Sequence, residues 1–161
     1  MINIIRNFAL ILFVTVSLAL VGAQAQSPND ALSFLRGIYN EYILAVKRGG
    51  EPRISRSIYT LALQRLWKQV DNQSECRVLN FDPLIDAQDY MLQSVNLKIL
   101  TRSSDRLTAN ASFRNGPLDP GNIITFDLIA TQGTWKIDNI TYKDGSDLRS
   151  SLVTGLRECK E

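Results

Sequence analysis

The chain has 161 residues, of which 45% are hydrophobic and 21% are charged, and it contains 18 Lys and Arg residues, 16 Asp and Glu residues and no histidine. The missing histidines exclude Ser-His-Asp and Cys-His nucleophilic catalysis and histidine-ligated metal sites. Nearly balanced charge argues against a dedicated nucleic-acid binder, whose affinity comes from clustered Lys and Arg. The hydrophobic fraction is ordinary for a globular domain.

Residues 1–25 have the pattern of a secretory signal peptide. An arginine precedes an apolar run over residues 8–21, and Ala23 and Ala25 are the small residues of a signal-peptidase site. We therefore expect cleavage before Gln26, a location in the periplasm or outside the cell, and no stable membrane insertion of the mature protein. The alternative is an uncleaved membrane anchor, for which the run is short and its flanks are weakly basic.

Two cysteines, Cys76 and Cys159, remain in the mature chain. In an oxidising compartment a lone pair of cysteines usually forms a disulfide bond. This bond would close a loop of roughly 80 residues, which the chain-entropy model values at about 4.5 kcal/mol. A redox-active pair is the alternative, but it normally has Cys-x-x-Cys spacing, which these cysteines lack.

The first helix is expected over about residues 28–48. Ser27 is placed to cap its start, Pro28 suits the first helical position, and Gly49-Gly50 is a stop signal. Apolar residues recur within it at three- and four-residue intervals: Leu32, Leu35, Ile38, Tyr39, Tyr42, Ile43 and Val46.

A second helix is expected over about residues 55–70. One face would carry Ile58, Leu61, Ala62, Leu66 and Val70. Arg56, Arg65 and Lys68 occupy much of the remainder, where we expect a solvated helix face; a docking patch is the alternative.

Residues 71–91 break the helical period, and a pattern of period two follows. Apolar and polar residues alternate over residues 94–99, 107–113, 124–130 and 135–140, with a slip of register before Ile140. A last helix is expected over about residues 146–159. Helices followed by an antiparallel meander with one apolar face predict a single α+β domain over residues 26–161.

Two segments resemble a known fold family. Residues 133–140 (GTWKIDNI) are similar to the late strand of nuclear-transport-factor-2-like proteins. Residues 81–84 (FDPL) and 87–90 (AQDY) resemble a loop of an uncharacterised family of exported bacterial proteins within that fold. The resemblance covers essentially the whole mature chain. It implies a cystatin-like cone fold, in which a curved four-stranded antiparallel sheet wraps around N-terminal helices and leaves a pocket, and it implies no reaction.

The loop at residues 82–90 is the one constellation that could carry chemistry. Asp82, Asp86 and Asp89 are spaced to share one face of a helical turn, where they and Gln88 could bind a ligand or a hard cation such as calcium. Two of the carboxylates could also act as a general acid and base. The simplest expectation is structural: Asp82 and Asp89 cap turns and helix ends.

Trp135 is the last candidate ligand-binding residue, although an aromatic residue on the apolar face of a strand is more often core. With no cofactor or metal motif, we expect an exported, non-enzymatic binding module for an unknown small ligand or protein partner. The alternatives are a periplasmic inhibitor or immunity-type protein acting on a toxin or hydrolase, and a carboxylate-based hydrolase or isomerase.

Overall fold

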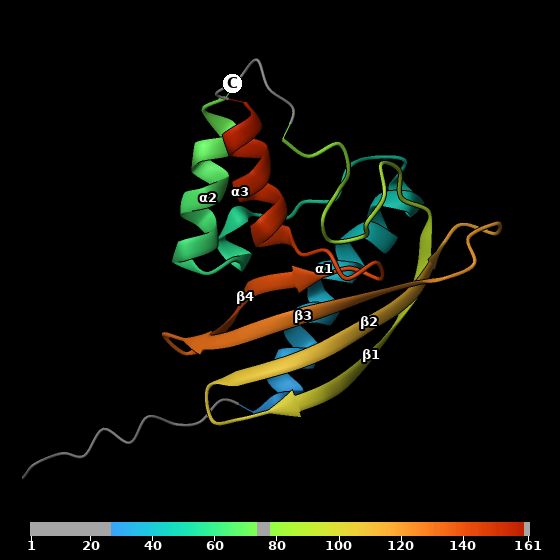
Figure 1. Cartoon of the computed structure of the whole chain (residues 1–161). Coiled ribbons are helices and arrows are strands. Elements are labelled where there is room, and N and C mark those ends of the chain that lie inside the picture. The colour runs from blue at the N-terminus through green and yellow to red at the C-terminus, as the bar shows by residue number, and fades with distance from the viewer. Residues whose placement is uncertain (1–26, 74–77, 160–161) are drawn as a thin grey trace, which may run out of the picture.

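The structure, a computed structural model, describes residues 27–73 and 78–159. It is an α+β fold with an open, four-stranded antiparallel sheet. Its elements in chain order are α1 (Pro28–Arg48), the 3-10 helix η1 (Arg56–Ile58), α2 (Leu61–Asp71), β1 (Leu92–Arg102), β2 (Arg106–Asn115), β3 (Asn122–Thr131), β4 (Thr134–Thr141) and α3 (Leu148–Glu158). Figure 1 shows α1 crossing one face of the sheet, with α2 and α3 side by side beyond β4.

Helix α1 has the expected bounds because its end signals are satisfied. Ser27 accepts a hydrogen bond from the Asn29 N–H, and Asp30 accepts one from the Ser27 N–H, which completes a capping box. At the other end Gly49 adopts φ +64°, the left-handed conformation that closes many helices.

The expected helix over residues 55–70 is wrong in its first part. After η1, Tyr59 is extended and forms a parallel bridge with Ile137 of β4, and the Thr60 N–H donates to the Ile137 carbonyl at 2.9 Å. Pairing with a distant strand thus overrides the local helical pattern. Thr60 then caps α2.

The expected apolar face of α2 is also wrong. The buried residues are Leu63 and Trp67, whereas Leu61 is 69% exposed. Leu66 and Val70 pack at the edge of the core. The predicted face is therefore wrong at Leu61 and Ala62, which are exposed, and it omits the two residues that are most buried. The basic residues Arg56, Arg65 and Lys68 are exposed, as expected of a solvated face.

The four strands agree with the period-two pattern and pair in sequence order, β1-β2-β3-β4. Alternate residues of β2 and β3 point into the core that α1 covers. The slip of register before Ile140 is a bulge: Asp127 pairs with Asn139 and Leu128 with Ile137, which leaves Asp138 as the extra residue.

Helix α3 begins slightly later than expected, because Asp147 is its N-cap, and Cys159 is its C-cap. Its packing on α2 and β4 closes one end of the molecule. The expected signal peptide and Cys76 lie outside the described residues, so the cleavage site and the disulfide pair stay predictions. No helix in the described part of the chain is long and apolar enough to span a membrane.

Candidate functional site

A cavity of about 420 Å³ opens between α1, the segment that contains η1, α2 and the loop at residues 79–84. We call this cavity the aromatic pocket. Four aromatic side chains line it: Tyr42, Tyr59, Trp67 and Phe81. The charged side chains of Arg56 and Asp82 also line it, together with apolar residues that include Ile54, Leu79 and Leu84. Its volume lies in the range of small-molecule sites.

Two tyrosines of α1 hold the loop that forms one wall of the pocket. The Tyr42 hydroxyl donates a hydrogen bond of 2.6 Å to Asp82 Oδ2, and the Tyr39 hydroxyl donates one of 3.0 Å to the Leu84 carbonyl. They lie one helical turn apart on α1, and both are almost completely buried. The wall is therefore fixed by the helix rather than by the loop alone.

Asp82 makes the local hydrogen bond expected of an Asp before proline. Its Oδ1 accepts from the Leu84 N–H at 2.9 Å, which forms an Asx turn. The loop is closed by a bridge in which the Asp82 N–H donates to the Ala87 carbonyl at 2.8 Å. Both carboxylate oxygens of Asp82 thus accept hydrogen bonds from the chain itself.

Burial keeps the tyrosines at this wall in their neutral, donating form. Desolvation raises the pKa of Tyr42 well above its ordinary value, and the Asp82 charge raises it further. Burial likewise raises the pKa of Tyr59, although the Arg56 guanidinium partly opposes this shift. Tyr42 therefore keeps its hydroxyl proton at neutral pH, as its hydrogen bond to Asp82 requires.

Another part of the pocket lining combines a cation with an aromatic ring. The Arg56 guanidinium carbon lies 3.5 Å from the centroid of the Trp67 ring, well within the range of a cation–π interaction. Trp67 is 5% exposed, and its indole Nε1 has no hydrogen-bond partner within the described chain. Arg56 also lies 3.7 Å from Asp71, a longer and half-exposed ion pair.

The structure does not bring the other acidic-loop candidates into the pocket. The shared face of Asp82, Asp86 and Asp89 required a helical turn, but the segment is a bridged turn in which Asp86 adopts φ +52°. Gln88 and Asp89 are exposed, and the expected cap by the Asp89 carboxylate is wrong: Asn115 Nδ2 instead donates to the Asp89 carbonyl at 2.6 Å. No three His, Cys, Asp or Glu side chains gather as a metal site in the described ranges.

Asp86 is a half-buried carboxylate that lies close enough to Asp144 to feel its charge. Burial raises its pKa, and the nearby Asp144 charge raises it further. Burial raises the pKa of Tyr142, and the charges of Asp86 and Asp82 raise it further. The buried Tyr142 hydroxyl has no hydrogen-bond partner among the described residues. Asp86 is nevertheless absent from the lining of the aromatic pocket.

Trp135 lies in the core near the start of α1. It is 3% exposed, and its indole N–H donates to the Ser27 carbonyl at 3.4 Å. It does not line the aromatic pocket. The structural interpretation of Trp135 therefore fits its position better than a role in a binding site.

Sequence reasoning missed Arg56 and Trp67 as site residues. The sequence pattern places Arg56 on a solvated helix face, and the apolar face that it predicts for α2 does not include Trp67. The available signal was the neighbourhood of Arg56, Tyr59 and Trp67 in one short segment rich in aromatic and basic residues. The contacts of this segment with β4, among them the Tyr59–Ile137 bridge and the hydrogen bond from Lys136 Nζ to the Ser57 carbonyl, join residues far apart in the sequence and could not be predicted from it.

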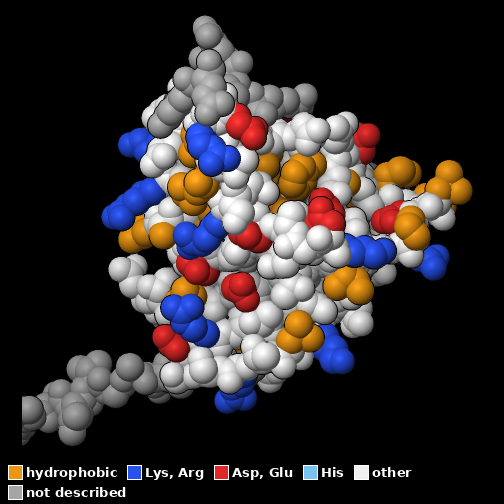
Figure 2. Space-filling model, viewed as in Figure 1, with side chains coloured by type: hydrophobic (Ala, Val, Ile, Leu, Met, Phe, Trp, Pro, Cys, Tyr) orange, Lys and Arg blue, Asp and Glu red, His pale blue; other side chains and the backbone are white. Residues whose placement is uncertain are grey.

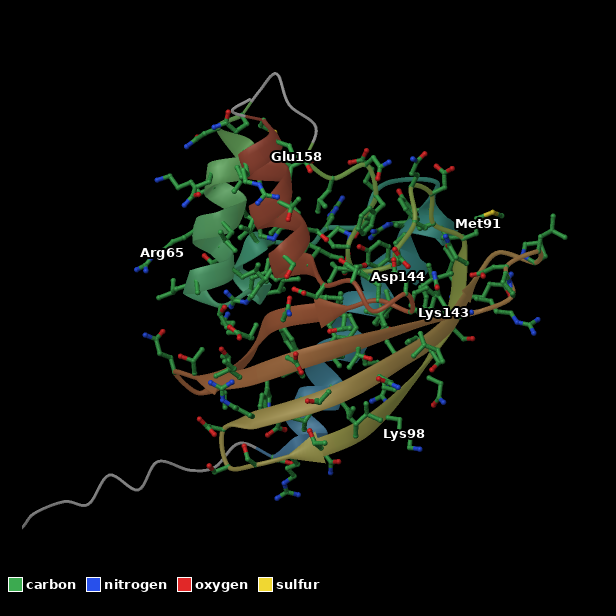
Figure 3. The ribbon with its side chains drawn as sticks, viewed as in Figure 1. Arg65, Met91, Lys98, Lys143, Asp144 and Glu158 are labelled. Atoms are coloured by element: carbon green, nitrogen blue, oxygen red, sulfur yellow. The ribbon has the colours of Figure 1, made fainter. Side chains whose placement is uncertain are left out.

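A second, larger hollow of about 900 Å³ lies at the end of the sheet near the β2–β3 loop. Figure 2 shows hydrophobic side chains gathered at this side of the molecule, and Figure 3 places Met91 and Lys143 there. Its apolar residues are largely exposed: Met91 is 56% exposed and Ile123 47%. The aromatic pocket is the stronger candidate because it combines buried aromatic side chains, a cation and an unpartnered donor. In the comparisons with known proteins, no family model, no curated protein and no solved structure matches this chain.

Proposed function

We propose that this protein is an exported, non-enzymatic binding module that holds a small ligand in the aromatic pocket. The observation that carries the proposal is the pocket itself, about 420 Å³ in volume, with four aromatic side chains around one cation and one carboxylate. Small-molecule sites are typically concave and mostly apolar with a few placed polar groups. Export is inferred from the signal-peptide pattern of residues 1–25.

The proposal includes the cone architecture. A four-stranded antiparallel sheet covers α1 on one face, and the pocket opens where the helices and the 79–84 loop meet. This arrangement is what a nuclear-transport-factor-2-like cone would provide. The arrangement is consistent with a fold whose core is packed at one end and opens to a ligand at the other end.

Binding is favoured over catalysis by the state of the carboxylates. Both oxygens of Asp82 are occupied by donors from Tyr42 and Leu84, so this side chain positions the loop. Asp86, the carboxylate with a raised pKa, does not line the same cavity. An acid–base pair would need both groups to reach one substrate.

The proposal is tested by filling the pocket. We expect a thermal-shift screen of small metabolites to yield compounds that raise the Tm of the wild-type protein by mass action. Ile54→Trp places a large ring in the pocket and should abolish the shift, whereas Val153→Trp, at a 54% exposed position of α3, should preserve it. Equal shifts in both variants would show that the ligands bind elsewhere.

One surface favours a second function, an inhibitor or immunity-type protein that binds a toxin or hydrolase. Leu118, at the tip of the β2–β3 loop, is 97% exposed, and Met91 and Ile123 are exposed nearby. Exposed apolar groups of this kind mark protein interfaces. Leu118→Asp should then weaken both the stoichiometric complex with the partner enzyme and the inhibition of that enzyme. Leu61→Asp, on α2, should change neither. Inhibition that is unchanged by Leu118→Asp would contradict this function.

A further inference from the structure

We propose that the β2–β3 loop and the hollow beside it form a two-fold interface between two copies of this chain, in which Leu118 of each copy enters the hollow of the other. The inference goes beyond the proposed ligand pocket and does not depend on it. Three observations carry it: an exposed leucine on a loop that is fixed in place, an open hollow beside that loop, and opposite charges on these two parts of one face.

The loop at residues 116–121 projects beyond the end of the sheet (Figure 1). Leu118 in this loop is 97% exposed, and Pro117 and Pro120 lie on either side of it in the sequence. Exposed apolar surface is unfavourable in water, and its removal from water on association is favourable. Leu118 is therefore the residue of this face that gains most from contact with another surface.

Hydrogen bonds fix the position of Leu118 before any association. Asp119 Oδ2 accepts from the Asn115 N–H at 2.5 Å, and its Oδ1 accepts from the Gly121 N–H at 2.9 Å, so one carboxylate ties both ends of the loop. The Asn115 side chain in turn accepts from the Met91 N–H at 2.7 Å, which joins the loop to the segment before β1. A loop that is already ordered loses little conformational freedom when it binds.

The hollow of about 900 Å³ lies against the same loop. Four residues of the loop line it, whereas Leu118 does not. Met91, Phe113 and Ile123 give it apolar surface, and two of them are accessible, since Met91 is 56% exposed and Ile123 47%. An exposed leucine beside an apolar hollow suits a two-fold interface, because each copy supplies both complementary parts.

The charges of this face favour a second copy over a foreign partner. Among the described residues that line the hollow, the charged ones are Arg114 and Lys143, which are both cations. The residue next to Leu118 is Asp119, and hydrogen bonds from the loop backbone hold the pKa of its carboxyl below the ordinary value, so it is charged at neutral pH. In the two-fold arrangement the carboxylate of each loop approaches the cations of the other copy, so the chain itself supplies the complementary charge.

The first test is the oligomeric state of the exported protein. We expect sedimentation equilibrium between about 1 and 100 μM to show a concentration-dependent monomer–dimer equilibrium. Leu118→Asp should weaken the dimer by about tenfold or more, because it places a carboxylate in an apolar hollow. Leu61→Asp is the matched control, since it makes the same change at a 69% exposed leucine of α2 and should leave the dimer unchanged.

A mixing experiment tests whether the leucine enters the hollow. Ser112→Trp places a ring in the hollow and keeps Leu118, so it should weaken the dimer as well. A mixture of Leu118→Asp and Ser112→Trp should form heterodimers more tightly than either variant forms homodimers, because one intact loop then meets one open hollow. No recovery in the mixture, measured by sedimentation with one variant fluorescently labelled, would overturn the arrangement.

A charge variant and the remaining outcomes complete the test. Lys143→Glu should weaken the dimer, whereas Lys98→Glu should not, because Lys98 lies on β1 apart from Lys143 and does not line the hollow (Figure 3). Wild-type protein that stays monomeric over the whole range would overturn the inference and leave this face to a foreign protein, which the inhibition assay with Leu118→Asp examines. A dimer that Leu118→Asp and Leu61→Asp weaken equally would overturn the location. The metabolite screen decides separately whether the aromatic pocket binds a ligand.

Discussion

The Asp82 carboxylate joins helix α1 to the loop that follows α2. One oxygen accepts from the Tyr42 hydroxyl and the other from the Leu84 N–H. The loop could not be fixed by its own sequence, because an Asx turn is a weak local preference. The tyrosines of α1 supply the missing constraint, and for this reason single hydrogen-bonding atoms decide the shape of the pocket wall.

Removal of the Tyr42 hydroxyl should destabilise the protein measurably. Tyr42→Phe leaves a half-buried carboxylate oxygen without its donor, and hydrogen bonds to charged groups contribute about 1.5–3 kcal/mol. Tyr90→Phe is the matched control, because the Tyr90 hydroxyl donates to the exposed Gly50 carbonyl and should cost about 1 kcal/mol or less. Urea unfolding measures both; equal losses would mean that Asp82 is satisfied by water.

Two glycines within helices should respond to alanine with opposite signs. Gly37 is exposed in α1 with nothing within 4 Å of an added Cβ, so Gly37→Ala should stabilise by about 0.5–1 kcal/mol. At Gly155 in α3 an added Cβ would lie 2.5 Å from Val78 Cγ1 and 3.2 Å from the Val78 carbonyl oxygen. Gly155→Ala should therefore destabilise, despite its better helix propensity. Thermal unfolding of the two variants measures whether each change raises or lowers the Tm. A raised Tm for Gly155→Ala would show that Val78 can move aside.

At the scale of elements, the sheet bulge connects both flanking helices to β4. Asp138, the extra residue of the bulge, accepts a hydrogen bond of 2.9 Å from the Thr60 hydroxyl at the start of α2 and forms an ion pair of 2.6 Å with Arg149 of α3. Bulges commonly redirect a side chain in this way. Here the redirected carboxylate sets where α2 and α3 begin relative to the sheet.

The start of α3 should be sensitive to acid. Burial alone would raise the pKa of Asp147, but hydrogen bonds from Ser150, Asn139 and Arg149 outweigh it and hold that pKa below its ordinary value. The charged cap therefore contributes stability above pH 4, and this contribution is lost as the pH falls through the lowered pKa.

Asp147→Asn gives the test of this pH dependence. Asparagine keeps a capping oxygen but does not titrate in this range. We expect the difference in unfolding free energy between the wild-type protein and Asp147→Asn to be larger at pH 6 than at pH 2.5. A difference that is constant with pH, measured by urea unfolding at both values, would contradict a role for the Asp147 charge.

The elements that could be predicted from the sequence are those specified by neighbouring residues. Helix α1 has its own caps, and β2 and β3 have a clear alternation, so all three lie where expected. The segment at residues 55–60 was mispredicted because its conformation depends on the Tyr59–Ile137 bridge, across 78 positions of the chain. The pocket could not be predicted for the same reason, because Arg56 and Asp82 line one cavity only through the tertiary packing of their two segments.

At the scale of the whole molecule, helices α2 and α3 together form one end of the fold (Figure 1). Helices α2 and α3 pack together beside β4, and their C-terminal ends lie at the same side of the molecule (Figure 1). Helix α2 ends at Asp71, only a few residues before Cys76, and Cys159 is the C-cap of α3. A chain of five residues can span about 17 Å, so this arrangement supports the predicted bond between Cys76 and Cys159.

The disulfide should stabilise the whole molecule by tying α3 to the end of α2. Alkylation of the exported protein, denatured without reductant, should label neither cysteine. Cys76→Ser, Cys159→Ser and the double variant should each lose the same free energy of unfolding, up to about 4.5 kcal/mol, because each removes the same cross-link. Reductant should lower the Tm of the wild-type protein alone. Two alkylated cysteines in the unreduced protein, or single variants whose losses add in the double variant, would show two independent thiols and leave the α2–α3 contact to hold this end unaided.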